Sequence, residues 1–282
     1  MGKVIDGKLL QSEIKSSFCE KVKSISDTLK LVVIQVGNDA ASSVYVRNKG
    51  RLCEEVGILF EHIKYDDISE DELIDKIKEL NVDSSVTGIL VQLPLPSHIN
   101  ESNVLESISS VKDVDGLTSK NISNLFAGND GIVPCTALGV MEIIRSTGVS
   151  VSSLNVVLVG RSKLVGLPLV SLLLRENATV TVCHSRTRDL SSITKNADIL
   201  IVAVGKKWLI DSSYVKEGAI VVDVGINRVD GKLYGDCNFS DILDKVSYIT
   251  PVPGGVGPLT VIMLINNKII IILTVIWYKR CI

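Results

Sequence analysis

The chain has 282 residues, 22% of them charged, and a formal net charge of −2, which allows one large domain or two smaller ones. This nearly balanced charge gives no reason to expect nucleic acid or an anionic membrane as a partner. The six cysteines are widely scattered, with no CxxC pair and no Cys/His spacing typical of zinc, so no metal site is predicted. Reduced thiols and a polar first segment indicate a cytoplasmic protein without a signal peptide.

Apolar runs typical of strands alternate with segments of helical type along the whole chain. The expected strands cover residues 31–36, 88–93, 156–159, 179–182, 199–204 and 219–224, and the expected helices cover 42–56, 70–80, 137–147 and 167–176. Unbroken Val/Ile/Leu runs are typical of strands that are buried on both faces. The sequence therefore predicts an α/β protein whose parallel sheets carry helices on each side.

The order of these elements predicts two α/β domains. The first comprises residues 1–138 plus 262–282, and the second, residues 139–261, contains a Rossmann-type parallel sheet. The run Ile269–Trp277 is apolar throughout, but its nine residues are too few to cross a membrane, which takes about 20. We expect it to form a buried helix or strand that returns to the first domain, because an exposed apolar run of this length would aggregate.

The expected helix 42–56 carries Tyr45, Lys49 and Cys53 at positions i, i+4 and i+8, so the three share one face. Ser42 or Ser43 is expected to cap its start. A Tyr–Lys pair taken alone is most often a solvated helix face.

Two other segments favour a functional role for that face. Gln92 follows a buried strand, and Asp113 and Asp115 lie in the turn KDVDG over residues 112–116. An amide, carboxylates, a lysine and an aromatic ring together can hold a flat heterocycle with amino and carbonyl edges.

The string GRSKLVGLP, residues 160–168, follows a strand and opens a helix. Gly160 and Gly166 leave bare backbone N–H groups beside a helix N-terminus, which suits a phosphate. No carboxylate occurs between Glu176 and Asp189 to hold a ribose 2′-hydroxyl, whereas four residues could hold a 2′-phosphate: Arg161, Ser162, Ser185 and Arg186. The pattern favours NADP over NAD; the alternative is a structural turn with solvated basic residues.

Glycines also close two later strands, in AVG at residues 203–205 and in DVGIN at residues 223–227. Such glycines line the ligand crevice of an open parallel sheet, although each one alone is more often an ordinary turn residue. The string PVPGGVGP, residues 251–258, imposes a rigid loop that suits either ligand binding or a stiff connector between domains.

Together these segments resemble the bifunctional methylenetetrahydrofolate dehydrogenase/methenyltetrahydrofolate cyclohydrolase (FolD) family. The matching strings are YVRNKGRLCEEVGI, GILVQLPLP, KDVDGL, PCTALGV, VVLVGRSKLVGLP, VTVCHSRT, ADILIVAVG, VVDVGIN and TPVPGGVGPLT. The resemblance implies a homodimeric, cytoplasmic enzyme of one-carbon metabolism and purine biosynthesis, with the active site between its domains. It implies NADP-dependent oxidation of 5,10-methylenetetrahydrofolate, followed by hydrolysis to 10-formyltetrahydrofolate.

The resemblance also implies roles for individual residues. The catalytic residues would be Lys49, Tyr45, Gln92 and Asp115, with Lys49 acting in proton transfer. The folate would be bound by Tyr45, Gln92, Asp113, Asp115, Gly255, Gly257 and Pro258. NADP would be bound by Gly160, Arg161, Ser162, Gly166, Ser185, Arg186, Gly205 and Ile226, the last beside the nicotinamide.

Two alternatives stand beside this interpretation. One is an NADP-dependent dehydrogenase of the amino-acid or shikimate type, which would have no reason to combine Tyr45, Lys49, Gln92 and Asp115. The other is a decayed paralogue that binds NADP without efficient catalysis. The Ile-rich tail after Met263 supports the second alternative, because the family usually ends in an amphipathic helix with acidic and alanine-rich content.

Overall fold

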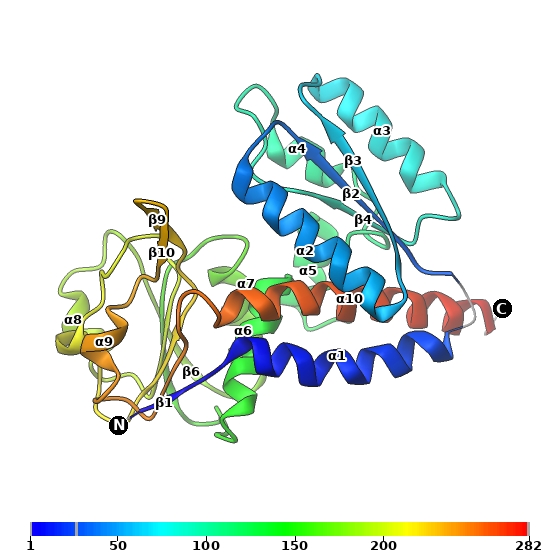
Figure 1. Cartoon of the computed structure of the whole chain (residues 1–282). Coiled ribbons are helices and arrows are strands. Elements are labelled where there is room, and N and C mark those ends of the chain that lie inside the picture. The colour runs from blue at the N-terminus through cyan, green and yellow to red at the C-terminus, as the bar shows by residue number, and fades with distance from the viewer. Residues whose placement is uncertain (1, 26–27, 281–282) are drawn as a thin grey trace. The chain divides into compact units, whose positions relative to one another are not determined.

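The computed structural model describes residues 2–25 and 28–280, and the chain divides into two compact units (Figure 1). Unit 1 comprises residues 1–13 and 134–260, and unit 2 comprises residues 14–133 and 261–282. Two helices, α1 (Gly7–Ser24) and α10 (Val256–Arg280), therefore contribute residues to both units. The sequence places all of residues 1–138 in one domain, whereas here the first 13 residues belong to unit 1. The physical reason is a strand, β1 (Lys3–Val4), that pairs with β11 (Tyr248–Ile249).

Unit 1 is built on a six-stranded sheet in the order β1-β11-β8-β7-β5-β6, in which every neighbouring pair is parallel. Its other strands are β5 (Asn155–Val159), β6 (Thr179–Cys183), β7 (Ile199–Val202) and β8 (Ile220–Asp223). The chain passes from β5 to β6 on one side and then crosses to β7 on the other side of β5. Ligands bind at such a reversal of strand order, outside the carboxyl ends of the strands.

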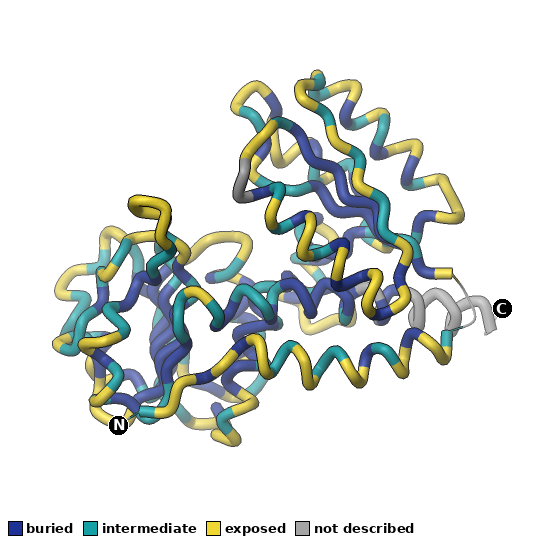
Figure 2. Tube along the Cα trace, viewed as in Figure 1, coloured by how far each residue is buried: buried dark blue, intermediate teal, exposed yellow. Residues whose placement is uncertain are grey.

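Helices cover both faces of this sheet, and its central strands β5, β7 and β8 are buried (Figure 2). The helices of unit 1 are α6 (Cys135–Ser146), α7 (Gly166–Arg175), α8 (Leu190–Thr194), the 3-10 helix η1 (Ser212–Tyr214) and α9 (Phe239–Ile242). One face, including Val157, Leu200 and Val221, packs against residues of α8, η1 and α9. Helix α6 contacts β8 and α7 contacts β6. A short hairpin, β9 (Asn227–Val229) and β10 (Lys232–Tyr234), follows β8.

Unit 2 contains a three-stranded parallel sheet in the order β3-β2-β4, formed by β3 (Leu59–Tyr65), β2 (Lys30–Val36) and β4 (Gly88–Val91). Helix α2 (Ala40–Val56) contacts β2 and β3, and α3 (Glu70–Val82) buries Leu73 and Ile77 in a core shared with the sheet. Two shorter helices follow, α4 (Glu101–Glu106) and α5 (Ser119–Ala127). Strand β3 is not among the predicted strands, because this edge strand alternates exposed and half-buried residues and lacks a continuous apolar run.

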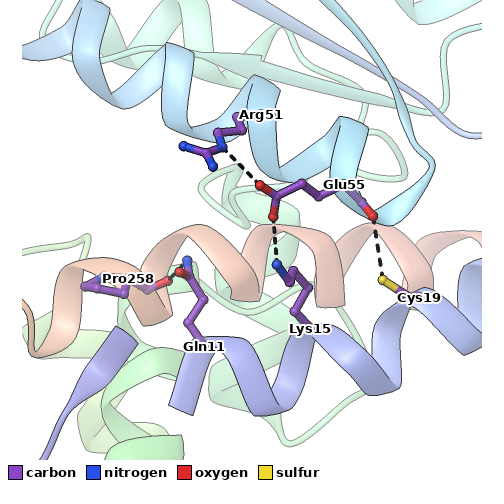
Figure 3. A network of polar contacts seen from close by, with 6 residues as sticks. All are labelled: Gln11, Lys15, Cys19, Arg51, Glu55 and Pro258. Atoms are coloured by element: carbon purple, nitrogen blue, oxygen red, sulfur yellow. Dashed lines mark hydrogen bonds and ion pairs between the residues drawn. The ribbon is translucent and has the colours of Figure 1, made fainter. Parts of the chain in front are cut away.

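An ion-pair network joins α1 to α2 within unit 2 (Figure 3). The carboxylate of Glu55 accepts from Lys15 Nζ at 2.8 Å and from Arg51 Nε at 3.0 Å. The Cys19 thiol donates to the carbonyl of Glu55 at 3.7 Å. The network fixes how the two helices lie against each other. Because its charges are partly exposed, each ion pair contributes at most about 1 kcal/mol to stability.

The C-terminal helix α10 buries its residues 261–265 together with Ile269 and Ile271. Within it, Asn267 is fully buried and donates to the carbonyls of Val114 at 3.0 Å and Val133 at 2.8 Å. The predicted return of the C-terminal segment to the first part of the chain is thereby confirmed. For the predicted buried run Ile269–Trp277, the side chains of Ile270 and of residues 272–277 lie outside the described residues. In the described part of the chain, no helix is both long and apolar enough to cross a membrane.

Candidate functional site

The turn between β5 and α7 has the close backbone packing that a dinucleotide site requires. A Cβ atom on Gly160, which has φ +129°, would lie 2.3 Å from the carbonyl oxygen of Ala203. A Cβ atom on Gly166 would lie 2.5 Å from the carbonyl oxygen of Gly160. Both positions therefore require glycine, and the N-terminus of α7 lies directly beside the end of β5. This geometry fits a pyrophosphate held by backbone N–H groups and the helix dipole.

Arg161 and Ser162 are exposed in this turn. The Ser162 hydroxyl oxygen accepts from the N–H of Val165 at 3.2 Å, and the Ser162 carbonyl accepts from the N–H of Leu167 at 3.0 Å. Ser162 thus holds the entry to α7, while its hydroxyl hydrogen can still be donated to a ligand.

The other two candidates for binding the 2′-phosphate, Ser185 and Arg186, lie in a tight turn after β6. His184 and Thr187 exchange hydrogen bonds: the N–H of Thr187 donates to the carbonyl of His184 at 2.8 Å, and the N–H of His184 donates to the Thr187 hydroxyl oxygen at 2.8 Å. The tip of this turn carries Ser185 and Arg186, both exposed. Because β5 and β6 are parallel neighbours, this turn and the Gly160 turn lie at the same edge of the sheet.

The two remaining cofactor candidates follow β7 and β8 at that edge. Gly205 has φ +64° and is exposed, and Ile226 is 49% exposed. A large apolar side chain that stays half in solvent at the carboxyl end of a sheet is available to cover a planar ring.

In unit 2, Tyr45 and Lys49 lie one turn apart on α2, and both are half-buried. The helix begins at Ala40, and the carboxylate of Asp39 caps it by accepting from the N–H of Ser42 at 2.6 Å. The predicted cap at Ser42 or Ser43 is therefore wrong, because Asp39 satisfies the first turn. Burial raises the pKa of the Tyr45 hydroxyl above its usual value, so the ring stays neutral.

Gln92 immediately follows β4 and contacts Lys49. Its Oε1 accepts from Lys49 Nζ at 3.0 Å, and its Nε2 donates to the carbonyl of Leu93 at 2.7 Å. The second bond fixes the amide so that its oxygen faces the lysine. A neutral amide thus orients the ammonium group, and Lys49 takes part in none of the ion pairs between described residues.

The two aspartates of the acidic turn have different environments. The Asp113 carboxylate is buried and accepts from Gly116 N at 2.9 Å, Thr118 N at 2.8 Å and Asn121 Nδ2 at 2.9 Å. Asp115 is half-buried. Asp113 therefore shapes the turn, whereas Asp115 is the more accessible carboxylate. The turn runs beside β4, where the N–H of Ile89 donates to the carbonyl of Lys112 at 2.7 Å.

The rigid loop of the sequence leads into α10. Gly255 is buried, and Gly257 and Pro258 lie half-buried in the first turn of the helix. Residues at the start of α1 lie against them: Gly7 N–H donates to the Gly254 carbonyl at 2.9 Å, and Gln11 Nε2 donates to the Pro258 carbonyl at 2.8 Å. These three candidates belong to unit 1, as do all eight cofactor candidates.

Sequence reasoning missed a buried pair of carboxylates, Asp223 and Asp236, and it missed Asn267. The signal for the pair was available: Asp223 precedes Gly225 by two residues, and Gly235 directly precedes Asp236. A Cβ on Gly225 would lie 2.1 Å from Asp236 Cγ, and one on Gly235 would lie 1.9 Å from Asp223 Oδ2. Each glycine thus makes room for the other segment's carboxylate. Among the described residues, no cluster of three or more His, Cys, Asp or Glu side chains is arranged to hold a metal ion.

Two family models match the chain and together cover most of it. The model described as tetrahydrofolate dehydrogenase/cyclohydrolase, catalytic domain, matches residues 5–115, and the NAD(P)-binding domain of the same description matches residues 134–275. The chain belongs to the tetrahydrofolate dehydrogenase/cyclohydrolase family. The second match extends into α10 as far as residue 275.

Individual relatives agree with this assignment. The bifunctional protein FolD of Agathobacter rectalis is 50% identical over 276 residues, which cover 95% of this chain and 98% of that protein. The crystal structure of the bifunctional FolD enzyme from Campylobacter jejuni has a TM-score of 0.93 and 46% identity, covering 97% of this chain and 99% of that one. The Trypanosoma brucei FolD structure, complexed with NADP cofactor and inhibitor, has a TM-score of 0.92 and 34% identity, covering 98% of each chain. The predicted family, enzyme class and α/β fold are confirmed.

Proposed function

We propose that this member of the tetrahydrofolate dehydrogenase/cyclohydrolase family oxidises 5,10-methylenetetrahydrofolate with NADP and hydrolyses the resulting methenyl compound to 10-formyltetrahydrofolate. The observation that carries the proposal is the 3.0 Å contact between Lys49 Nζ and Gln92 Oε1, within the segment that matches the family's catalytic domain. A half-buried lysine that is oriented by an amide and lies one helical turn from Tyr45 suits proton transfer beside an aromatic substrate.

The residues of unit 1 fit NADP. The glycine turn of Gly160 and Gly166 at the N-terminus of α7 suits its pyrophosphate, and Gly205 and Ile226, which follow β7 and β8, would lie beside the nicotinamide. The 2′-phosphate would be held by Arg161, Ser162, Ser185 and Arg186, which lie at one edge of the sheet with no carboxylate between residues 177 and 188. When bound, NADP accepts the hydride that leaves the methylene carbon.

The residues of unit 2 carry the hydrolytic half of the reaction. Water oxygen bonds to the methenyl carbon, and Lys49 assists as one proton leaves that water. The hydroxyl oxygen then gives up its proton as the formyl C=O forms, the bond from this carbon to N5 breaks, and N5 takes up a proton, so that one proton is released overall. Tyr45 covers the folate ring, and Asp115 accepts from its amino edge. Asp113 holds the turn that carries Asp115. We also propose Gly255, Gly257 and Pro258 as folate-binding residues.

The alternative of a decayed, non-catalytic paralogue is not favoured. Asn267, within the unusual tail, is buried and donates two hydrogen bonds, so this part of the tail is integrated in the fold.

We also propose that the protein is a homodimer in the cytoplasm. Light scattering after size exclusion tests it, because a dimer has twice the 30.5 kDa mass of the chain.

A spectrophotometric assay tests the function directly. Purified protein is mixed with 5,10-methylenetetrahydrofolate and either NADP or NAD, and the appearance of reduced cofactor is followed. The methenyl compound is then supplied alone, and its disappearance is followed. We expect reduction of NADP in the first assay and hydrolysis in the second. Failure of both assays with folded protein would refute the proposal.

A further inference from the structure

We infer that Asp236 is a positioning residue for the nicotinamide half of NADP, because its single carboxylate holds the two loops that follow β7 and β8. This inference rests on the proposed dehydrogenase function and assigns a role to a residue outside the predicted cofactor set. Asp236 itself is fully buried, so it acts through the loops and not by touching the cofactor.

The first loop is residues 203–206, which follow β7. Three consecutive backbone N–H groups of this loop converge on Asp236: Val204 N lies 2.7 Å and Gly205 N 3.0 Å from Oδ2, and Lys206 N lies 2.7 Å from Oδ1. Three successive N–H groups form an anion-binding concavity, and here the protein fills it with its own carboxylate. The inner side of the loop is thus fixed, while Gly205 and Lys206 stay exposed on the outside.

The second loop is residues 224–227, which follow β8. Asn227 Nδ2 donates to Asp236 Oδ1 at 2.9 Å, so each carboxylate oxygen accepts two hydrogen bonds. Gly225 lies so close to the carboxylate that a Cβ there would be 2.1 Å from Asp236 Cγ. Ile226, the exposed apolar residue of the cofactor edge, is therefore held between two neighbours that both contact Asp236.

A second carboxylate holds Asp236 in place. Asp223 Oδ1 accepts from Gly225 N at 3.0 Å and from Asp236 N at 3.0 Å, and Asp223 Oδ2 accepts from Cys237 N at 2.8 Å. Among the described residues, the donors to these two buried groups are backbone N–H groups, the Asn227 amide and the Cys237 thiol, and none of them is a cation. Such a network is stable only while its donors stay aligned, which makes it a rigid support for the two loops.

The position of the loops assigns them to one half of the cofactor. The candidates for the 2′-phosphate follow β5 and β6, and the pyrophosphate turn lies between β5 and α7. Strands β7 and β8 lie on the opposite side of β5 from β6. A dinucleotide that extends across the point where strand order reverses therefore places its nicotinamide end over the loops that Asp236 holds.

The test is Asp236→Asn, which removes the charge and turns an amide N–H toward a backbone donor. We expect the KM for NADP to rise at least fivefold, while 2′,5′-ADP, a probe of the adenine half alone, binds within twofold of wild type. Hydrolysis of the methenyl compound, which requires no NADP, should also stay within twofold. Asp198→Asn is the matched control: Asp198 accepts from Asn155 N at 2.8 Å at the opposite, amino edge of the same sheet, and its loss should leave the KM for NADP unchanged.

Asn227→Ala, which removes one of the four donors, provides a milder variant should Asp236→Asn not fold. We expect a two- to fourfold rise in the KM for NADP. A parallel loss of NADP and 2′,5′-ADP binding in either folded variant would show that the network only stabilises unit 1, and an unchanged KM would equally overturn the inference. Either result overturns only the role of Asp236, provided that wild-type protein reduces NADP. Failure of the proposed dehydrogenase function would show instead as wild-type protein that does not reduce NADP.

Discussion

Lys49 and Gln92 are 43 positions apart in the sequence, yet Nζ of one lies 3.0 Å from Oε1 of the other. The contact joins a helix face to the end of a buried strand. It gives the ammonium group a fixed direction without neutralising it, since an amide carries no charge.

Lys49→Met tests the lysine itself. We expect hydrolysis of the methenyl compound to fall at least about 100-fold, the usual range for loss of a general acid–base group, while NADP affinity stays within twofold. Lys76→Met on α3, where Lys76 pairs with Glu79 at 2.8 Å, is the control for loss of a lysine from unit 2. Normal hydrolysis by Lys49→Met would remove this residue from the mechanism.

Gln92→Met tests the orientation of the lysine. The side chain keeps its length but loses the oxygen that accepts from Nζ. A hydrogen bond to a charged group contributes about 1.5–3 kcal/mol, so we expect the kcat of hydrolysis to fall roughly 10- to 100-fold. Steady-state rates over a range of substrate concentrations check this. A change confined to KM would mean that Gln92 binds folate without orienting Lys49.

Arg161→Ala tests the 2′-phosphate site. We expect the Kd for NADP to rise more than about tenfold, because one charge-assisted bond is lost, and the Kd for NAD to change less than twofold. Calorimetric titration measures both constants. Arg175→Ala, at the other end of α7, controls for the general loss of positive charge. Equal losses for the two cofactors would show that Arg161 does not contact the extra phosphate.

Asp223 predicts a pH dependence of stability. Burial raises the pKa of its carboxyl from 3.8 to about 6, although the N–H donors of Cys237 and Asp236 oppose the shift. The folded protein therefore holds this proton more tightly than the unfolded chain, and the stability present at low pH is lost as the pH rises through 6. Relative to Asp223→Asn, wild type should gain about 1 kcal/mol of unfolding free energy between pH 7 and pH 5.

Urea unfolding of both proteins at several pH values checks this expectation. The comparison with Asp223→Asn cancels the contributions of the other titrating groups. A difference between the two proteins that stays constant from pH 7 to pH 5 would mean that the Asp223 carboxyl keeps its ordinary pKa.

Asn267→Leu tests whether the tail is part of the fold. The substitution removes the Nδ2 donor from the carbonyls of Val114 and Val133, which costs about 2–4 kcal/mol. Asn266→Leu, at the half-buried neighbouring position, should cost less than about 1 kcal/mol. Thermal and urea unfolding measure both effects. Equal stability of the two variants would contradict the structural role of Asn267.

The sequence predicts well those elements whose burial is uniform. The strands β2, β4, β5 and β7 are continuous apolar runs, and the turn after β5 requires glycine for steric reasons that the string GRSKLVGLP already expresses. Strands β1 and β11 have two residues each, and they form by pairing with distant strands, β1 with β11 and β11 also with β8, so no local pattern predicts them. Edge strand β3 alternates exposed and half-buried residues and has no continuous apolar run, so the sequence does not predict it either.

In the candidate site, too, features with a local sequence pattern are predicted and features that depend on distant residues are not. Tyr45 and Lys49 are one helical turn apart, so local spacing predicts their shared face. The support behind the cofactor edge depends on Asp236 meeting residues 204–206, some 30 positions earlier, which spacing alone does not encode. Asn267 shows the opposite case: a polar residue in an apolar run indicates a damaged tail, whereas in the structure its Nδ2 donates to two distant carbonyls.

The interleaved composition of the two units has a consequence for biosynthesis. Strand β1 leaves the ribosome long before its partner β11, which is made almost 250 residues later. The sheet of unit 2 is complete by Val91, yet the buried residues of α10 that belong with it begin only at Val261. Each unit therefore closes its core through contacts of very long sequence separation, which slow folding and delay it until late in synthesis.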